Sequence, residues 1–435
     1  MQTIFLMEAF TLYKSRRSSQ RLSGRFLRMY EMVSSGRDGG LWPHPLRLTN
    51  SQLASKPSAR TKADVDELAN ITPTSDDARV FQQWSAWTDS HAWQRLLLAC
   101  VVLEAQQAVL LAREPVSAIT ADIELPIPTR MNFWEAEDAR SWATSILENT
   151  PQTIYIRDVL ENPSIVLPQG LDTFQSAVLI AGYDNMFFSS IGSPTSPFLG
   201  PFGQLTQASS FLPILSPDSA TQTYYHISEL VHNAPRRALL AVSGESWVYS
   251  SRLSTNATQA GAEFASLKLE LRKWADDTEI PGQETIESEQ PREKALLNAI
   301  RVLRLAADRG NLPQEPWLFG GEIAVYISTL VLWALCSRAL QRTLPFNFSM
   351  STDLSGEGPF FSQNAISDFL RRAESDIAAG GEIKGWREGV RAVIISTKGL
   401  LRGNETDEKQ IGELFQGCVG VLDKLWRKGW DEPWF

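Results

Sequence analysis

Apolar residues recur at three- and four-residue spacing along most of the chain, the pattern of helices that bury one side. The longest stretch with one consistent pattern runs from Phe81 to Trp142. Asp89 and Ser90 offer an N-cap there, and an apolar run over 96–111 follows, broken only by a few polar residues. Because apolar side chains fall on nearly every side of this predicted helix, we expect it to lie within a core.

A proline pair interrupts the pattern after this helix. Each proline of the Leu-Pro-Ile-Pro sequence over 125–128 fixes its own φ and disfavours the helical conformation of the residue before it, which predicts an extended strap. Asn132 then stands three residues before Glu135, the spacing of a capping box. The region is therefore predicted to be helix, extended strap, helix.

The same periodicity predicts most of the remaining chain, and alternation typical of strands is nowhere sustained. We therefore predict an all-α fold, one large multi-helix domain with long Pro/Gly/Ser-rich loops. The further helices are expected at Leu171–Tyr183, Thr223–His232, Arg237–Tyr249, Ala260–Trp274, Glu293–Asp308, Gly321–Gln341, Ile366–Ala379, Trp386–Leu401 and Ile411–Trp430.

Composition shifts divide the chain into three parts. Residues 1–33 are predicted to form a helix whose second half is basic from Lys14 to Arg28, which suits an anionic surface or, more simply, a solvated face paired with acids elsewhere. Residues 34–80 are rich in Ser, Gly, Pro and Asp and predict a loop-rich connection. Residues 81–435 form the helical body, with mobile loops expected near 189–221 and, because of its acidic composition, 276–292.

Charge and cysteine content narrow the class of protein. A formal net charge of −9 disfavours nucleic-acid binding by the chain as a whole. The three cysteines stand far apart in apolar segments, which favours reduced thiols in the cytosol or nucleus. The apolar run Ile323–Cys336 is shorter than the roughly 20 residues that span a bilayer, so we expect a buried helix and no membrane contact.

Residues with the spacing of known catalytic or metal sites are not found in the sequence. The nearest approach is His226, Glu229 and His232, whose side chains diverge around a helix and do not share a face. No nucleophile elbow, phosphate loop or dinucleotide fingerprint occurs, and the acidic run 276–279 is expected to be a solvated helix end. We therefore expect no catalytic, cofactor-binding or metal-binding residue, no cofactor in this chain, and no enzyme activity.

Several ordered pieces of the sequence resemble the regulatory domain of fungal transcription factors, the fungal-specific transcription factor domain or middle homology region. These pieces are Trp84 and Trp87, Arg95-Leu96, Gln106-Gln107, the Leu-Pro-Ile-Pro strap, Phe133–Ala136, Leu240–Val248 and Thr329–Ala334. They extend over most of the chain and carry no catalytic signature. The landmark residues within and beside them are Trp93, Leu125, Pro126, Pro128, Trp134, Trp247 and Trp333.

The resemblance implies a nuclear transcription regulator whose helical body governs a DNA-binding zinc module. That module is absent here and would lie upstream, with residues 1–33 as the remainder of a domain that began earlier. Zinc is implied only for that module, because Cys100, Cys336 and Cys418 are too isolated to build one. The expected partners are other transcription-regulatory proteins or a second copy of this chain. We expect the chain alone to bind DNA weakly and to purify without zinc.

Two other classes of function compete with this interpretation. A helical enzyme of secondary metabolism with an apolar pocket would need convergent polar groups in that pocket. A protein-interaction scaffold would need an exposed apolar patch.

Overall fold

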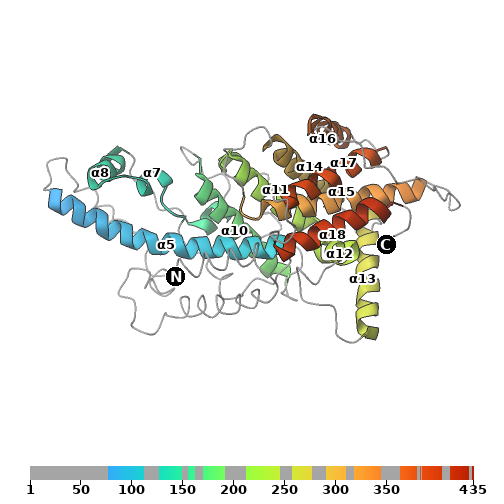
Figure 1. Ribbon diagram of the computed structural model, residues 1–435. Helices are drawn as coiled ribbons and strands as arrows, with labels where there is room; N and C mark the ends of the chain where they lie inside the picture. Colours follow the sequence, from blue (N-terminus) through green and yellow to red (C-terminus); the bar gives the residue numbers. More distant parts are fainter. Residues whose placement is uncertain are drawn as a thin grey trace. The chain divides into compact units, whose positions relative to one another are not determined.

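The computed structural model confirms the all-α prediction, since every element in the described ranges is helical (Figure 1). The chain divides into two compact units, one ending at Ser216 and one beginning at Pro217, with the segment Gln107–Glu114 assigned to the second. The structure describes residues 77–111, 127–148, 155–161, 170–191, 212–244, 257–276, 291–309, 318–343, 363–379, 383, 385–403, 412–430 and 434–435.

The first unit is organised around the long helix α5. Its amphipathic partner α8 buries Trp142 and Ile146 in a cluster with Val80, and Trp84 and Trp87 of α5 pack against the same cluster. The helical elements are α5 (Asp77–Leu111, which continues into the second unit after Gln106), α7 (Met131–Trp134), α8 (Ala139–Glu148), α9 (Ile156–Glu161), α10 (Thr173–Ile191) and the 3-10 turn η4 (Leu212–Ile214).

The N-cap predicted at Asp89 and Ser90 is wrong, because both residues lie inside α5, which begins at Asp77. The physical reason is tertiary: Trp84 and Trp87 gain burial against the α8 cluster only if the helix continues through them. The run of buried residues towards the end of α5, where every residue from Cys100 to Leu111 is buried, agrees with the prediction of a core helix.

The capping box predicted at Asn132 and Glu135 is also wrong. Asn132 lies inside the short helix α7, and the backbone N–H of Glu135 donates to the carbonyl of Met131. The reciprocal box forms instead at the start of α8: Ser141 N–H donates to Asp138 Oδ1 over 2.7 Å, and Asp138 N–H donates to Ser141 Oγ over 3.2 Å.

The second unit surrounds α15. This helix is buried without interruption from Ile323 to Ser337 and contacts α11, α12, α13, α14 and α17, so its apolar residues find protein on all sides. The helices are α11 (Ser219–Asn233), α12 (Arg236–Ser243), α13 (Ala257–Asp276), α14 (Pro291–Arg309), α15 (Gly321–Thr343), α16 (Gln363–Ala378), α17 (Arg387–Arg402) and α18 (Glu413–Lys428).

Two helices are long and apolar enough to cross a membrane by length and composition, α5 and α15. The α15 candidate, Gly321–Gln341, has 21 residues, whereas the apolar run Ile323–Cys336 counted from the sequence has fourteen. The most apolar windows of α5 and α15 are 82% and 83% buried inside the protein, as core helices are, so this is weak evidence for a span. The absence of membrane contact stays a prediction.

Several predictions fall wholly or partly outside the described residues. These are the helix over 1–33, nearly all of the connection 34–80, the landmarks Leu125, Pro126 and Trp247, and the interiors of the expected loops, 192–211 and 277–290. At the ends of those loops, α10 continues to Ile191 and α11 begins at Ser219, while α13 ends at Asp276 and α14 begins at Pro291. The division into 1–33, 34–80 and 81–435 stays a prediction.

Candidate functional site

The segment 127–134 of the first unit, which contains the described half of the predicted strap, is held by polar contacts to α5 and to the start of α10. Ile127 is buried, and the carbonyl of Pro128 accepts a hydrogen bond of 2.7 Å from Gln175 Nε2. Met131 N–H donates to Asp172 Oδ2 over 2.8 Å, and Arg130 Nη2 donates to the carbonyl of Gly170. The strap landmark Pro128 therefore has a structural role in docking this segment.

Asp172 serves two elements at once. Its second oxygen, Oδ1, accepts from Gln175 N–H over 2.8 Å at the start of α10, while Gln175 Oε1 accepts from Asp172 N–H over 3.1 Å. This is a reciprocal capping arrangement. Both carboxylate oxygens of Asp172 are therefore already engaged by backbone N–H groups.

Arg95 of α5 lies against this segment and is buried, with 9% of its surface exposed. Nη2 donates to the carbonyl of Thr129 over 2.5 Å, and Nη1 contacts Met131 Sδ at 3.5 Å. The guanidinium carbon lies 5.1 Å from the ring centroid of Trp134 and 5.4 Å from that of Phe174. Burial lowers the pKa of Arg95, and the nearby charges of Asp172 and Glu135 oppose that shift.

Trp134 lies beside Arg95 within a group of aromatic rings of the first unit. Trp134 is half-buried, with its ring 6.4 Å from that of Trp87, and Trp87 in turn lies 5.6 Å from Trp142 and 4.4 Å from the imidazole of His91. Trp93 lies in α5, and its side chain is outside the described part of the structure. Arg95, Pro128 and Trp134, separate pieces of the resemblance, are thus brought together by the fold.

Trp333 occupies the centre of the second unit. It is fully buried, its Nε1–H donates to the carbonyl of Gly429 over 3.2 Å, and the rings of Trp434 and Phe435 lie 5.6 and 6.2 Å away. A Cβ at position 429 would lie 2.7 Å from Trp333 Nε1, so this contact needs glycine. Trp333 is a packing residue that also satisfies its one polar atom.

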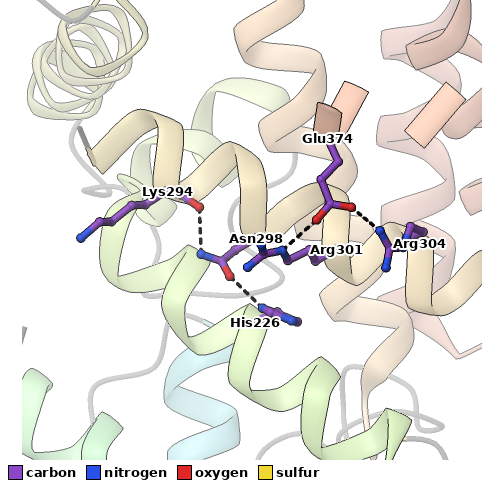
Figure 2. A network of polar contacts seen from close by, with 6 residues as sticks. All are labelled: His226, Lys294, Asn298, Arg301, Arg304 and Glu374. Carbon is purple, nitrogen blue, oxygen red and sulfur yellow. Dashed lines mark hydrogen bonds and ion pairs between the residues drawn. The ribbon is translucent and has the colours of Figure 1, made fainter. Parts of the chain in front are cut away.

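A polar network joins three helices of the second unit (Figure 2). His226 Nδ1 on α11 lies 2.8 Å from Asn298 Oδ1 on α14, and Asn298 Nδ2 donates to the carbonyl of Lys294. On the same helix, Arg301 and Arg304 both donate to Glu374 of α16, with Arg301 Nε 3.0 Å from Glu374 Oε1. The amide oxygen can only accept, so His226 carries a proton on Nδ1.

This network is structural in its chemistry. Burial lowers the pKa of His226 to about 4, so the imidazole is neutral at pH 7, with its Nδ1 engaged by an amide. The sequence-based judgement that His226 and His232 do not form a metal pair is compatible with this arrangement. Among the residues the structure describes, no group of three or more His, Cys, Asp or Glu side chains could hold a metal ion.

Asp276 corrects a further prediction. It was expected to be a solvated helix end, yet only 12% of its side chain is exposed, and Arg338 of α15 binds both its oxygens at 2.6 and 2.7 Å. Hydrogen bonding to Asp276 raises the pKa of Arg338.

The three cysteines are free and buried, and burial raises the pKa of Cys100 and of Cys336 to about 12, which makes both poor nucleophiles.

Comparison with curated proteins finds a partial similarity to Zinc finger protein zas1 of Schizosaccharomyces pombe. The two are 23% identical over 153 residues, which is 35% of this chain and 14% of that protein. The chain thus matches only a small part of that relative's length. No protein-family description and no solved structure matches the chain. Over about a third of its length, the chain is therefore similar to a fungal zinc finger protein.

Proposed function

We propose that this chain is the regulatory part of a fungal transcription regulator of the zinc-finger class, acting in the nucleus on transcription by RNA polymerase II. The observation that carries the proposal is the partial similarity to a fungal zinc finger protein, the class that the ordered landmarks of the sequence also resemble. The all-α architecture and the docking of segment 127–134 onto α5 and α10 are compatible with it. In this proposal DNA contact belongs to a separate zinc module, and the partners are other regulatory proteins or a second copy of the chain.

The direct test tethers the chain to a heterologous DNA-binding domain upstream of a reporter gene in a fungal host. We expect reporter transcription to change several-fold relative to the DNA-binding domain alone, in either direction. Arg140→Gln, which alters an exposed arginine, is the matched control and should behave as the unmodified chain. Trp333→Ala should lose the effect, because it removes a fully buried side chain from the core of the second unit.

An unchanged level of reporter transcription would contradict the proposal. If the fusion is folded, nuclear and bound at its site, yet reporter transcription is unchanged, the chain is not a transcription regulator of this kind. Separately, the purified chain should carry no stoichiometric zinc and should bind a specific duplex no better than a scrambled one at physiological salt.

A further inference from the structure

Buried polar atoms with no hydrogen-bond partner occur on one side of α5 and on segment 127–134. They are Thr88 Oγ1, His91 Nδ1 and Arg95 Nε of α5 and Thr129 Oγ1 of the segment, although the His91 side chain also has a hydrogen bond to that of Gln94. Thr88, His91 and Arg95 are spaced three and four residues apart, so they lie on one side of the helix. Buried polar atoms normally have partners, so this cluster needs an explanation.

The unpartnered atoms have one chemical property in common, since all can donate hydrogen bonds. Arginine has only donors, the threonine hydroxyls can donate, and a neutral imidazole can hold its proton on Nδ1. The group that completes such a set is an acceptor, and next to a guanidinium the strongest acceptor is an anionic oxygen. The cluster is therefore complementary to a carboxylate.

The protein's own described carboxylates do not meet this need. The charge of Asp172 acts on Arg95, but its oxygens accept from the backbone N–H groups of Met131 and Gln175, and it forms no ion pair with Arg95 within the described residues. The charge of Glu135 also acts on Arg95, but Glu135 is exposed and likewise forms no ion pair with it there. Arg95 is thus a buried cation held by a carbonyl, a sulfur and two rings, whereas buried charged side chains are usually paired with an opposite charge.

We propose that Arg95, with Thr129 and His91, forms a binding site for the carboxylate group of a small aromatic molecule. Arg95 Nε and Thr129 Oγ1 donate to the carboxylate, and the rings of Trp134 and Phe174 beside the guanidinium form the apolar wall that such sites use for the body of a ligand. Met131, whose flexible side chain contacts Arg95 Nη1 through its sulfur, is 39% exposed, so one neighbour of the guanidinium lies at the surface.

The test is isothermal titration of the full chain with benzoate, compared with benzamide, its neutral analogue of the same shape. We expect saturable binding of benzoate in the millimolar range, and titration to about 50 mM covers that range for a ligand of this size. Benzamide should bind at least about tenfold more weakly, because a neutral acceptor loses the charge-assisted hydrogen bonds.

Substitutions locate the site. Arg95→Met should weaken benzoate binding about tenfold or more, and Thr129→Val about threefold, because each removes one class of donor. Arg140→Gln is the matched control: it changes an exposed arginine of the same unit and should leave affinity unchanged. If Arg95→Met does not fold, Arg95→Lys serves instead, since it keeps the charge but lacks the guanidinium Nε–H and should also bind about tenfold more weakly.

Three results would overturn the proposal. They are no saturable heat with benzoate, equal affinity for benzoate and benzamide, and unchanged benzoate affinity in a folded Arg95 variant. The inference does not depend on the proposed function. Benzoate can bind when the reporter assay shows no change, and the reporter can respond when benzoate does not bind.

Discussion

The region around Arg95 in the first unit and the region around α15 in the second bury the same kinds of residue in different ways. In the second unit, Arg338 meets both oxygens of Asp276, and the N–H of Trp333 meets the carbonyl of Gly429. In the first unit, Arg95 meets a carbonyl, a sulfur and two rings, and its Nε has no partner among the described residues.

The difference shows which polar groups the fold itself accounts for. Arg338 and the Trp333 N–H have acceptors of the same unit, so these contacts contribute to packing and to the pairing of helices, although Ser328 Oγ of α15 and Arg391 Nε of α17 are buried without a partner among the described residues. Around Arg95 the unpartnered atoms, Arg95 Nε and Thr129 Oγ1, belong to the proposed carboxylate site. Experiments that compare the two regions can test this distinction.

The largest expected effect separates the two landmark tryptophans. Trp333→Ala should lower the free energy of unfolding by about 3–5 kcal/mol, because it empties a fully buried site. Trp134→Ala should cost only about 1–2 kcal/mol, because Trp134 is half-buried. Denaturant unfolding of both variants measures the difference, and equal losses would contradict the contrast between the regions.

The next effect concerns pH and the buried histidine of the second unit. Burial lowers the pKa of His226 from 6.5 to about 4. Between these two pH values the imidazole binds a proton in the unfolded chain and stays neutral in the folded protein. Its contribution to stability is complete above pH 6.5 and is lost as the pH falls towards about 4, by up to about 3 kcal/mol.

Unfolding curves of the wild type and of His226→Gln between pH 7 and 4 test this. The pH-dependent loss of stability should be smaller in the variant, and His91→Gln should reduce it by a similar amount, since burial also lowers the pKa of His91 to about 4. Parallel curves for wild type and His226→Gln would show that the histidine is not neutral by burial.

Two arginine-to-methionine substitutions give the sharpest comparison. Arg338→Met should cost about 2–3 kcal/mol of unfolding free energy, because it leaves the carboxylate of Asp276, 12% exposed, without its partner. Arg95→Met should cost less than about 1 kcal/mol, because no carboxylate is orphaned and an apolar side chain of similar length replaces a desolvated cation. Thermal or denaturant unfolding of both variants measures the two losses of unfolding free energy. A larger loss for Arg95→Met than for Arg338→Met would mean that Arg95 is a structural cation with no spare capacity.

The smallest effect concerns a helix cap. Asp218 caps α11 by accepting from Thr221 N–H over 2.9 Å and from the Thr221 hydroxyl over 2.7 Å, so Asp218→Ala should cost about 1 kcal/mol. Asp218→Asn is the matched control and should cost less, because it keeps an oxygen for the N–H group. A denaturant midpoint unchanged by Asp218→Ala would show that the cap does not stabilise the second unit.

Most of the helical elements were predictable, whereas the contacts of the site were not. Predicted and observed bounds agree within a few residues for the helices at Pro291–Arg309, Gly321–Thr343, Gln363–Ala378, Arg387–Arg402 and Glu413–Lys428. The strap landmarks and Arg95 were singled out from the sequence, but their mutual contacts and the unpartnered donors were not. The prediction of helix ends failed where two nearby sequences could both form a capping box. At Asn132 the spacing suggested such a box, but the box forms between Asp138 and Ser141.

Hydrophobic periodicity was enough to place most of the helices and their buried faces, because it acts between residues three and four apart along the chain. The start of α5 and the partners of the buried polar groups depend instead on how the helices pack against one another. His226 and Asn298, Arg338 and Asp276, and Arg95 and Thr129 are far apart along the chain, and nothing local marks them as partners. Each pairing depends on which helix faces come together, and the packing of the apolar side chains decides this. The pattern of apolar residues does not reveal which polar atoms then become neighbours.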